Sequence, residues 1–330
     1  MTTMEDRADI HDPEISAFMS QLPPGVFDFD EWTLETVAQR RAARAQDAVA
    51  ALPETTTVSH EERVDDDVRV RVYSPPAPAA ARPCVYWIHG GGYISGSGLT
   101  VDARLNRWAQ ALDCVVVSVD YRLAPEHPYP APLLDCYAGM EWTVEHADRL
   151  GIDTGHILVA GSSAGAGLAA ALTLFARDRE GPRLGLQLLI YPMLDDRQST
   201  PSSRREGAAV WGRPANALGW RAYLGPLGAE GADVPGYAAP ARAQDLTGLP
   251  PACVVVGGAD LFRDESVAYA ARLLAAGVET ELHVYPGVPH GFEVLVPTAD
   301  VSRRCDADIT GALRRALRPA HISACFRTPN

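Results

Sequence analysis

A serine between glycines is the first feature of this sequence that could do chemistry. The run G-S-S-A-G at residues 161–165 follows an apolar stretch typical of a strand and precedes an alanine-rich stretch typical of a helix. In the pattern G-x-S-x-G, the glycines let strand and helix meet at a tight turn that lifts the central serine hydroxyl above the sheet edge. The pattern therefore predicts Ser163 as a nucleophile. Ser162 fits less well, because methyl groups of Ala160 and Ala164 would crowd the turn.

The same stretch also contains the pattern of a dinucleotide-binding loop. The letters G-A-G-L-A-A at residues 165–170 match G-x-G-x-x-A. The match begins inside the predicted helix, and no acidic residue ends a second strand about 20 residues further on. Asp178 and Glu180 lie at a helix end instead. We therefore expect no nicotinamide or flavin cofactor.

A serine nucleophile needs a base, and three histidines follow Ser163 in the chain. The order serine, acid, histidine that accompanies this turn leaves His283, His290 and His321. His321 lies in a tail without a pattern, and His283 lies within an alternating strand. His290 lies in the loop P-G-V-P-H-G-F, whose prolines and glycines can hold a side chain over the sheet edge. We predict His290 as the base.

The predicted acid is a carboxylate that follows an apolar strand. The strand-like run at residues 252–258 is followed by Asp260, Asp264 and Glu265. The carboxyl edge of a parallel sheet is where such folds present functional groups, which favours Asp260. Asp264 and Glu265 fall in the first turn of a helix, where acidic residues are common for dipole and capping reasons. Asp260 could also be a helix cap, and the residues alone leave that alternative open.

Three consecutive glycines follow another predicted strand, residues 84–89. The bare amides of Gly90, Gly91 and Gly92 could point at one place, which suits a phosphate or a developing oxyanion. The chain has no lysine, so a phosphate would lack its usual cation. Two of these amides, with the amide of Ala164, would form a donor cluster for a tetrahedral intermediate.

The composition excludes several classes of function. Twenty-nine basic residues, all arginine, against 42 acidic residues give a net charge of −13, which argues against nucleic acid and against an anionic membrane surface. The missing lysine excludes P-loop nucleotide hydrolysis and Schiff-base chemistry. No run approaches the roughly 18 apolar residues that span a bilayer, and the acidic start lacks the pattern of a signal peptide. We expect no membrane insertion and a cytoplasmic location.

The six cysteines and the alternation of elements indicate the fold class. The cysteines are scattered without a CxxC pair, which favours buried free thiols over disulfides or a metal site. Period-two patterns at 55–64 and 67–74 predict two half-buried strands, and continuous apolar runs separated by helical patterns predict an α/β fold with a mostly parallel eight-stranded sheet covered on both faces. The apolar runs are 84–89, 114–120, 156–161, 186–192, 252–258 and 280–286, and the helices are 32–49, 101–112, 133–146, 164–178, 264–276 and 299–317.

Five motifs in this order resemble those of the bacterial hormone-sensitive-lipase family of esterases, also called family IV. They are H-G-G-G-Y-I-S-G-S at 89–97, D-Y-R-L-A-P-E-H-P-Y-P-A at 120–131, G-S-S-A-G-A-G at 161–167, D-L-F-R-D-E at 260–265 and H-G-F at 290–292. The resemblance covers roughly residues 60 to 317 and implies the α/β-hydrolase fold, with residues 120–126 as an arch that supports the glycine loop. It implies a catalytic triad and oxyanion donors, which are Ser163, Asp260 and His290 with Gly91, Gly92 and Ala164.

The family also builds a helical cap from two separate parts of the chain. The resemblance implies cap parts at 1–45 and 196–230, hydrolase core at 46–195 and 231–318, and a tail at 319–330. No strand pattern occurs between Asp195 and about Leu249, as expected for an insertion of this kind. The substrate pocket is expected to include Tyr93, Ser162, Trp211 and Phe262. Ser162 and Ala166 depart from the family's GDSAGG, and Leu261 replaces the proline of DPLRD, so the substrate range is less well specified than the reaction.

We therefore expect a serine hydrolase that acts on short- to medium-chain carboxylic esters, without a metal or cofactor. Its expected partner is a small-molecule ester, and a homodimer is left open. An amidase or N-acyl hydrolase is the alternative, because the same intermediate serves both bonds. A non-catalytic receptor of this fold is the third interpretation, and the presence of His290 argues against it.

Overall fold

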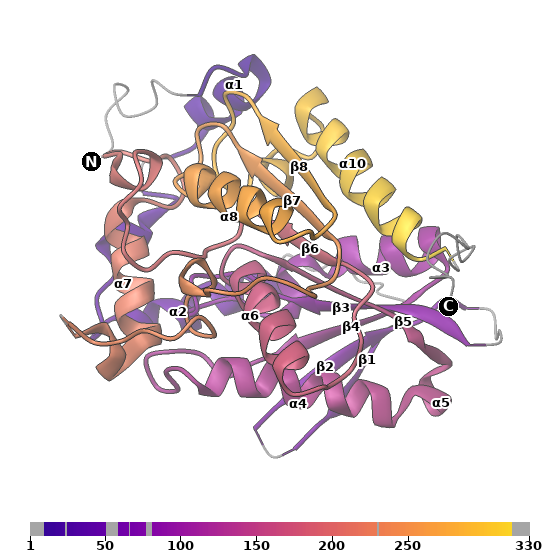
Figure 1. Ribbon diagram of the computed structural model, residues 1–330. Coiled ribbons are helices and arrows are strands. Elements are labelled where there is room, and N and C mark those ends of the chain that lie inside the picture. The colour runs from indigo at the N-terminus through magenta and orange to yellow at the C-terminus, as the bar shows by residue number, and fades with distance from the viewer. Residues whose placement is uncertain are drawn as a thin grey trace.

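Eight strands form one sheet in the computed structural model, which describes residues 10–23, 25–50, 59–65, 67–76, 81–229 and 231–318. Their order across the sheet is β1-β2-β4-β3-β5-β6-β7-β8 (Figure 1). β1 pairs antiparallel with β2, and β2 with β4, whereas every later pair is parallel. The prediction of a mostly parallel eight-stranded sheet is confirmed. The strands are β1 (Ser59–Arg63), β2 (Arg69–Tyr73), β3 (Arg82–Ile88), β4 (Val115–Asp120), β5 (Ile152–Ser162), β6 (Gln187–Ile190), β7 (Ala252–Gly257) and β8 (Thr280–Tyr285).

The central strands are buried along nearly their whole length. All residues of β6 and β7 are buried, as are five consecutive residues of both β3 and β4. Side chains of a strand alternate between faces, so such runs require apolar layers on both sides of the sheet. β5 begins at Ile152, earlier than the predicted 156, because Ile152 pairs with Arg82 of β3 before a register shift.

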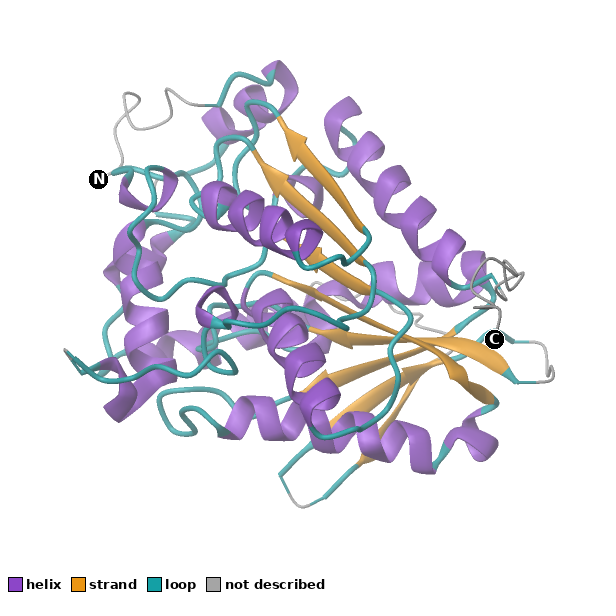
Figure 2. Ribbon diagram, viewed as in Figure 1, coloured by secondary structure: helices purple, strands orange, loops and turns teal. Residues whose placement is uncertain are grey.

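Helices supply these two layers (Figure 2). One apolar cluster includes residues of α4, α6 and α8, and the other includes residues of α1, α3 and α10. The predicted helix 164–178 agrees with α6 at both ends, and the other predicted core helices differ by one to a few residues. The helices are α1 (Pro13–Gln21), α2 (Val37–Ala50), α3 (Asp102–Leu112), α4 (Ala131–Glu145), α5 (Ala147–Leu150), α6 (Ala164–Asp178), α7 (Arg213–Leu224), α8 (Arg263–Ala275), α9 (Phe292–Leu295) and α10 (Asp300–Ala316).

The N-terminal residues contact two different parts of the molecule. Helix α1 buries Ile15 and Met19 in the cluster that contains α10. The 3₁₀ helix η2 (Asp28–Glu31) lies against α7 instead, and Asp30 accepts a hydrogen bond from the N–H of Ala215 at 3.0 Å. The inserted segment contributes α7 and short 3₁₀ turns, and its described residues from Asp195 to Leu249 contain no strand, as expected. The division into cap and core stays a prediction.

The prediction of buried free thiols is confirmed for the cysteines that the structure describes. Cys84, Cys114, Cys136, Cys253 and Cys305 are buried free thiols. Cys325, like His321 and the predicted tail, lies outside the described residues. Among the described helices, none is both long enough and apolar enough to cross a membrane.

Candidate active site

Ser163 lies at a strained turn between β5 and α6. Its backbone has φ 55° and ψ −123°, a region that non-glycine residues rarely adopt. A Cβ on Gly161 would lie 2.4 Å from the carbonyl oxygen of Gly165, and a Cβ on Gly165 would lie 2.2 Å from that of Ile88. The flanking glycines are therefore required by the close approach of helix and strands. Gly167, the second glycine of the dinucleotide-like pattern, also faces protein backbone, since a Cβ there would lie 2.2 Å from the carbonyl oxygen of Met193.

The structure brings the three predicted triad residues together. His290 Nε2 lies 3.1 Å from Ser163 Oγ, and His290 Nδ1 lies 2.8 Å from Asp260 Oδ2. The other oxygen of Asp260 accepts the N–H of Phe262 at 2.9 Å, and Asp260 is 1% exposed. An Nδ1–H donated to the carboxylate leaves Nε2 free to accept the serine proton. The arrangement can therefore deprotonate Ser163 as it attacks.

Asp264 and Glu265, which follow Asp260 in the sequence, accept backbone N–H groups of other loops and do not contact His290 in the described structure. Asp264 Oδ2 accepts the N–H of Ser202 at 2.7 Å, which fixes the turn that follows β6 in the inserted segment. Glu265 Oε1 accepts the N–H groups of Leu194 and Asp195 at 2.7 and 3.2 Å. His283 lies in β8 and contacts Glu281 at 2.7 Å. The hydrogen-bond distances therefore distinguish Asp260 from Asp264 and Glu265, and His290 from His283.

Glu265 provides a pH-dependent test of this packing. Burial raises the pKa of its carboxyl well above the usual range, although the two backbone N–H groups act in the opposite direction. The folded protein therefore keeps a proton that the unfolded chain releases near pH 4.3, so the free energy of unfolding falls as pH rises above that value. We expect Glu265→Gln to remove a slope that approaches about 1.4 kcal/mol per pH unit. Urea unfolding of both proteins between pH 5 and 8 measures the difference.

Asp264→Asn is the matched control for this experiment. Burial acts to raise the Asp264 pKa, but the Arg263 side chain and the N–H of Ser202 outweigh it and lower the pKa. Asp264 is then ionised in both states above pH 5, so its variant should follow the pH dependence of the wild type. Parallel curves for wild type and Glu265→Gln would contradict the prediction.

The glycine loop lies beside the nucleophile. Gly91 and Gly92 have φ of 122° and 61°, and a Cβ on Gly90 would lie 3.2 Å from the Cβ of Ser163. Within the described residues, the N–H groups of Gly91, Gly92 and Ala164 have no backbone acceptor. Donors that are left free beside a nucleophile can stabilise an oxyanion that forms there.

The arch expected from the resemblance supports this loop. Tyr121 stacks on His89 with ring centroids 4.3 Å apart, and its hydroxyl donates to the carbonyl of His89 at 3.1 Å. The N–H of Ala124 donates to the carbonyl of Tyr93 at 3.0 Å. Arg41 of α2 donates to the carbonyls of Ile94 and Ala124, both at 2.7 Å. The glycine loop is therefore held from the sheet and from the N-terminal segment.

The four predicted pocket residues occupy different surroundings. Trp211 packs on the glycine loop, where a Cβ on Gly92 would lie 2.2 Å from the indole. Ser162 adjoins the same loop, and the ring of Phe262 meets His290 edge to face at 5.3 Å. Tyr93 is 1% exposed and stacks on Tyr223 at 4.0 Å. Their role in substrate binding stays a prediction.

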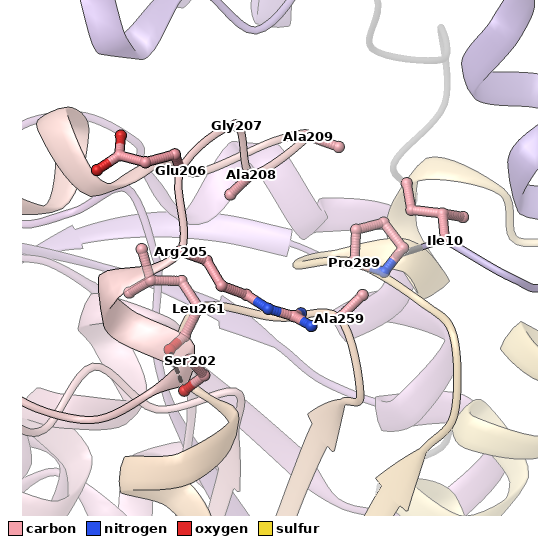
Figure 3. A pocket seen from close by; sticks show the side chains of 10 residues that line it. All are labelled: Ile10, Ser202, Arg205, Glu206, Gly207, Ala208, Ala209, Ala259, Leu261 and Pro289. Atoms are coloured by element: carbon pink, nitrogen blue, oxygen red, sulfur yellow. Dashed lines mark hydrogen bonds between the residues drawn. The ribbon is translucent and has the colours of Figure 1, made fainter. Parts of the chain in front are cut away.

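A small cavity is lined in part by residues adjacent in sequence to Asp260 and His290 (Figure 3). It measures about 20 Å³ and is lined by Ala259, Leu261 and Pro289, next to the triad residues, and by Ile10 and the inserted segment at 205–209. A space of this size holds about one water molecule. It is too small for an acyl chain.

Two further observations were not expected from the sequence. Tyr191, at the end of an apolar strand, contacts His290 with ring centroids 4.5 Å apart. No pattern in the sequence distinguishes this tyrosine from a core residue.

On strands β7 and β8, Cys253, Glu281 and His283 have potential ligand atoms within 4.8 Å of one another. Glu281 is already paired with His283 and Arg315 there.

Comparisons with known proteins find several related esterases. A family model described as alpha/beta hydrolase fold matches residues 85–294. The chain is 41% identical to the esterase LipI of Mycobacterium tuberculosis, over 68% of this chain and 71% of the relative. It is 39% identical to the carboxylesterase NlhH of the same species, over 85% and 89%. A solved structure titled as a bacterial heroin esterase superposes with a TM-score of 0.85 at 39% identity, covering 93% of this chain and 98% of the other.

Proposed function

This chain is a carboxylesterase that belongs to the α/β-hydrolase-fold family, and we propose that it cleaves short- to medium-chain acyl esters through an acyl-enzyme on Ser163. The contact series Ser163–His290–Asp260 is the observation that carries the proposal. The resemblance to family IV motifs supports the same residues. The substrate is a small-molecule ester, and a homodimer stays a prediction.

In the proposed mechanism, Ser163 Oγ attacks the ester carbonyl carbon while His290 Nε2 takes the hydroxyl proton. Asp260 holds the imidazole orientation and stabilises its cationic form. The carbonyl oxygen becomes an oxyanion that the N–H groups of Gly91, Gly92 and Ala164 stabilise. The intermediate collapses as His290 gives the proton to the leaving alcohol. Water then attacks the acyl-enzyme by the same route, which releases the acid and restores Ser163.

We expect catalytic efficiency to rise from acetyl to about butyryl or hexanoyl esters and to fall steeply by dodecanoyl. Each methylene that fits contributes about 0.8 kcal/mol of burial until the chain reaches a wall. Trp211 is a candidate for such a wall, because it lies on Gly92 and its ring meets the ring of Phe29 with centroids 5.2 Å apart. A series of p-nitrophenyl esters from acetyl to palmitoyl measures the profile. Equal efficiency on palmitoyl esters would contradict a closed pocket.

Trp211→Leu should move the preferred chain length upward by a few carbons, since it removes part of the wall. Trp142→Leu is the matched control, because Trp142 is a similarly buried tryptophan of α4 that stacks on His146. Both variants lose buried aromatic area, but only Trp211→Leu should change the chain-length profile.

A matched ester and amide, measured in parallel, distinguish esterase from amidase activity. Mass spectrometry of a fluorophosphonate adduct should locate the label on Ser163.

A further inference from the structure

A buried polar network lies directly behind His290. The Tyr191 ring meets the imidazole edge to face, with centroids 4.5 Å apart and planes at 62°. The Tyr191 hydroxyl donates to Glu293 Oε1 at 2.9 Å. Arg104 donates to the same oxygen through Nη1 and Nη2 at 3.1 and 3.2 Å. These three residues, here the Tyr-Glu-Arg network, join α3, the end of β6 and α9.

The contribution of the Tyr-Glu-Arg network to folding stability does not by itself explain its presence. Tyr191, Glu293 and Arg104 are 4%, 3% and 7% exposed. Moving an ion pair out of water costs desolvation energy that the attraction offsets only in part. Glu293 Oε2 also has no hydrogen-bond partner within the described residues. The position of the Arg104–Glu293 pair close to His290 therefore indicates that the pair serves to fix the position of Tyr191.

The backbone of Tyr191 is constrained as well. Its φ is 38°, in the left-handed region that costs a non-glycine residue free energy. The N–H of Tyr191 donates to the carbonyl of Val255 at 2.5 Å, and the preceding carbonyl, of Ile190, accepts the N–H of Ser163 at 2.9 Å. Tyr191, which contacts His290, therefore directly follows Ile190, whose carbonyl accepts a hydrogen bond from Ser163.

We propose that Tyr191 is a positioning residue for His290, and that Glu293 and Arg104 hold Tyr191 in place. This inference rests on the proposed function. His290 must keep its bond to Asp260 while Nε2 passes a proton from Ser163 to the leaving alcohol. The Tyr191 ring limits the imidazole on one side, and the Phe262 ring contacts it at 5.3 Å. A misplacement of about 1 Å at a reacting group can cost about a hundredfold in rate.

The hydroxyl of Tyr191 is suited to this task. Burial raises the pKa of Tyr191 well above its usual range, and the charge of Glu293 adds to the effect. The hydroxyl therefore stays protonated and donates to Glu293 over the whole working pH range. Removing it frees the ring to tilt without removing the ring itself.

Tyr191→Phe tests the proposal, with Tyr285→Phe as the matched control. Tyr285 is also buried and donates its hydroxyl to a carboxylate, Asp308 Oδ2, at 2.6 Å, but its ring lies against Phe292. Both variants lose one hydroxyl-to-carboxylate bond, and thermal unfolding measures what each loses in stability. We expect Tyr191→Phe to lower kcat about tenfold with KM within twofold of wild type, and Tyr285→Phe to leave kcat within twofold.

A second variant separates a network from a single contact. Glu293→Gln should lower kcat to a similar extent, and adding it to Tyr191→Phe should lower kcat no further, because both act on the same ring. The rate of fluorophosphonate labelling at Ser163 should fall in parallel, since it depends on the same base. A kcat for Tyr191→Phe equal to that of Tyr285→Phe, or a rise in KM alone, would overturn the inference. Failure of the proposed function is distinguished by Ser163→Ala, which would then retain activity.

Discussion

Replacing Ser163 with alanine should lower ester turnover by about a million-fold while the protein stays folded. In the proposed mechanism, the side chain supplies the atom that attacks the carbonyl, and among the described residues only Ser163 is hydrogen-bonded to His290 Nε2, at 3.1 Å. Donors of the glycine loop would still stabilise an oxyanion formed by water, which leaves a small residual rate. The initial rate on a butyryl ester, with circular dichroism as the check on folding, gives the result.

Ser162→Ala is the neighbouring control. Ser162 precedes the strained turn, and its hydroxyl lies near Gly90, where a Cβ would be 3.2 Å away. We expect its loss to change turnover by less than about tenfold, because it takes no part in proton transfer. Abolished activity in Ser162→Ala together with a substantial rate in Ser163→Ala would mean that the nucleophile is misassigned.

Asp260→Asn should lower kcat by about ten thousand-fold with little change in fold. The side-chain amide can donate to His290 Nδ1, which stabilises the tautomer whose Nε2 carries the proton and cannot accept one from Ser163. The amide also cannot stabilise a cationic imidazole. The hydrogen bond from Phe262 N to Asp260 Oδ1 can persist with the amide oxygen, so the loop should keep its shape.

Asp264→Asn is the control that the sequence itself suggests, since both carboxylates follow β7. Asp264 bonds Ser202 and Arg263, and its loss should weaken the turn of the inserted segment by about 1 kcal/mol. Turnover should stay within about tenfold of wild type. If Asp264→Asn were the more damaging change, Asp260 would be a structural cap and the acid would have to be reassigned.

The sequence predicts the sheet and the site positions because local chemistry determines them. Continuous apolar runs require a sheet buried on both faces, and glycines beside Ser163 are required by contacts under 3 Å. The order of Ser163, Asp260 and His290 along the chain leaves few alternatives. The sequence favours Asp260 over Asp264 but leaves open that Asp260 is only a helix cap, and the distance of 2.8 Å from Asp260 Oδ2 to His290 Nδ1 argues against that alternative.

Other features depend on contacts between distant segments and have no local pattern. Arg41 looks like one of several arginines on an amphipathic helix, yet it donates to the carbonyl of Ile94, beside the glycine loop, and to that of Ala124 in the arch. Tyr191 looks like an apolar core residue, and Arg104 and Glu293 are 189 positions apart in the chain. Hydrophobic periodicity records which face is buried but not which partner is met.

The contact between Trp211 and Gly92 would link acyl-chain selectivity to turnover. The indole that would limit the acyl group rests on a residue whose N–H would stabilise the oxyanion. α7 adds a second contact, because a Cβ on Gly219 would lie 2.7 Å from the carbonyl oxygen of Gly92. A substitution that widens the substrate range at this wall would also loosen the glycine that we propose as an oxyanion donor. Variants that accept larger esters should therefore need a compensating change in the glycine loop to recover turnover.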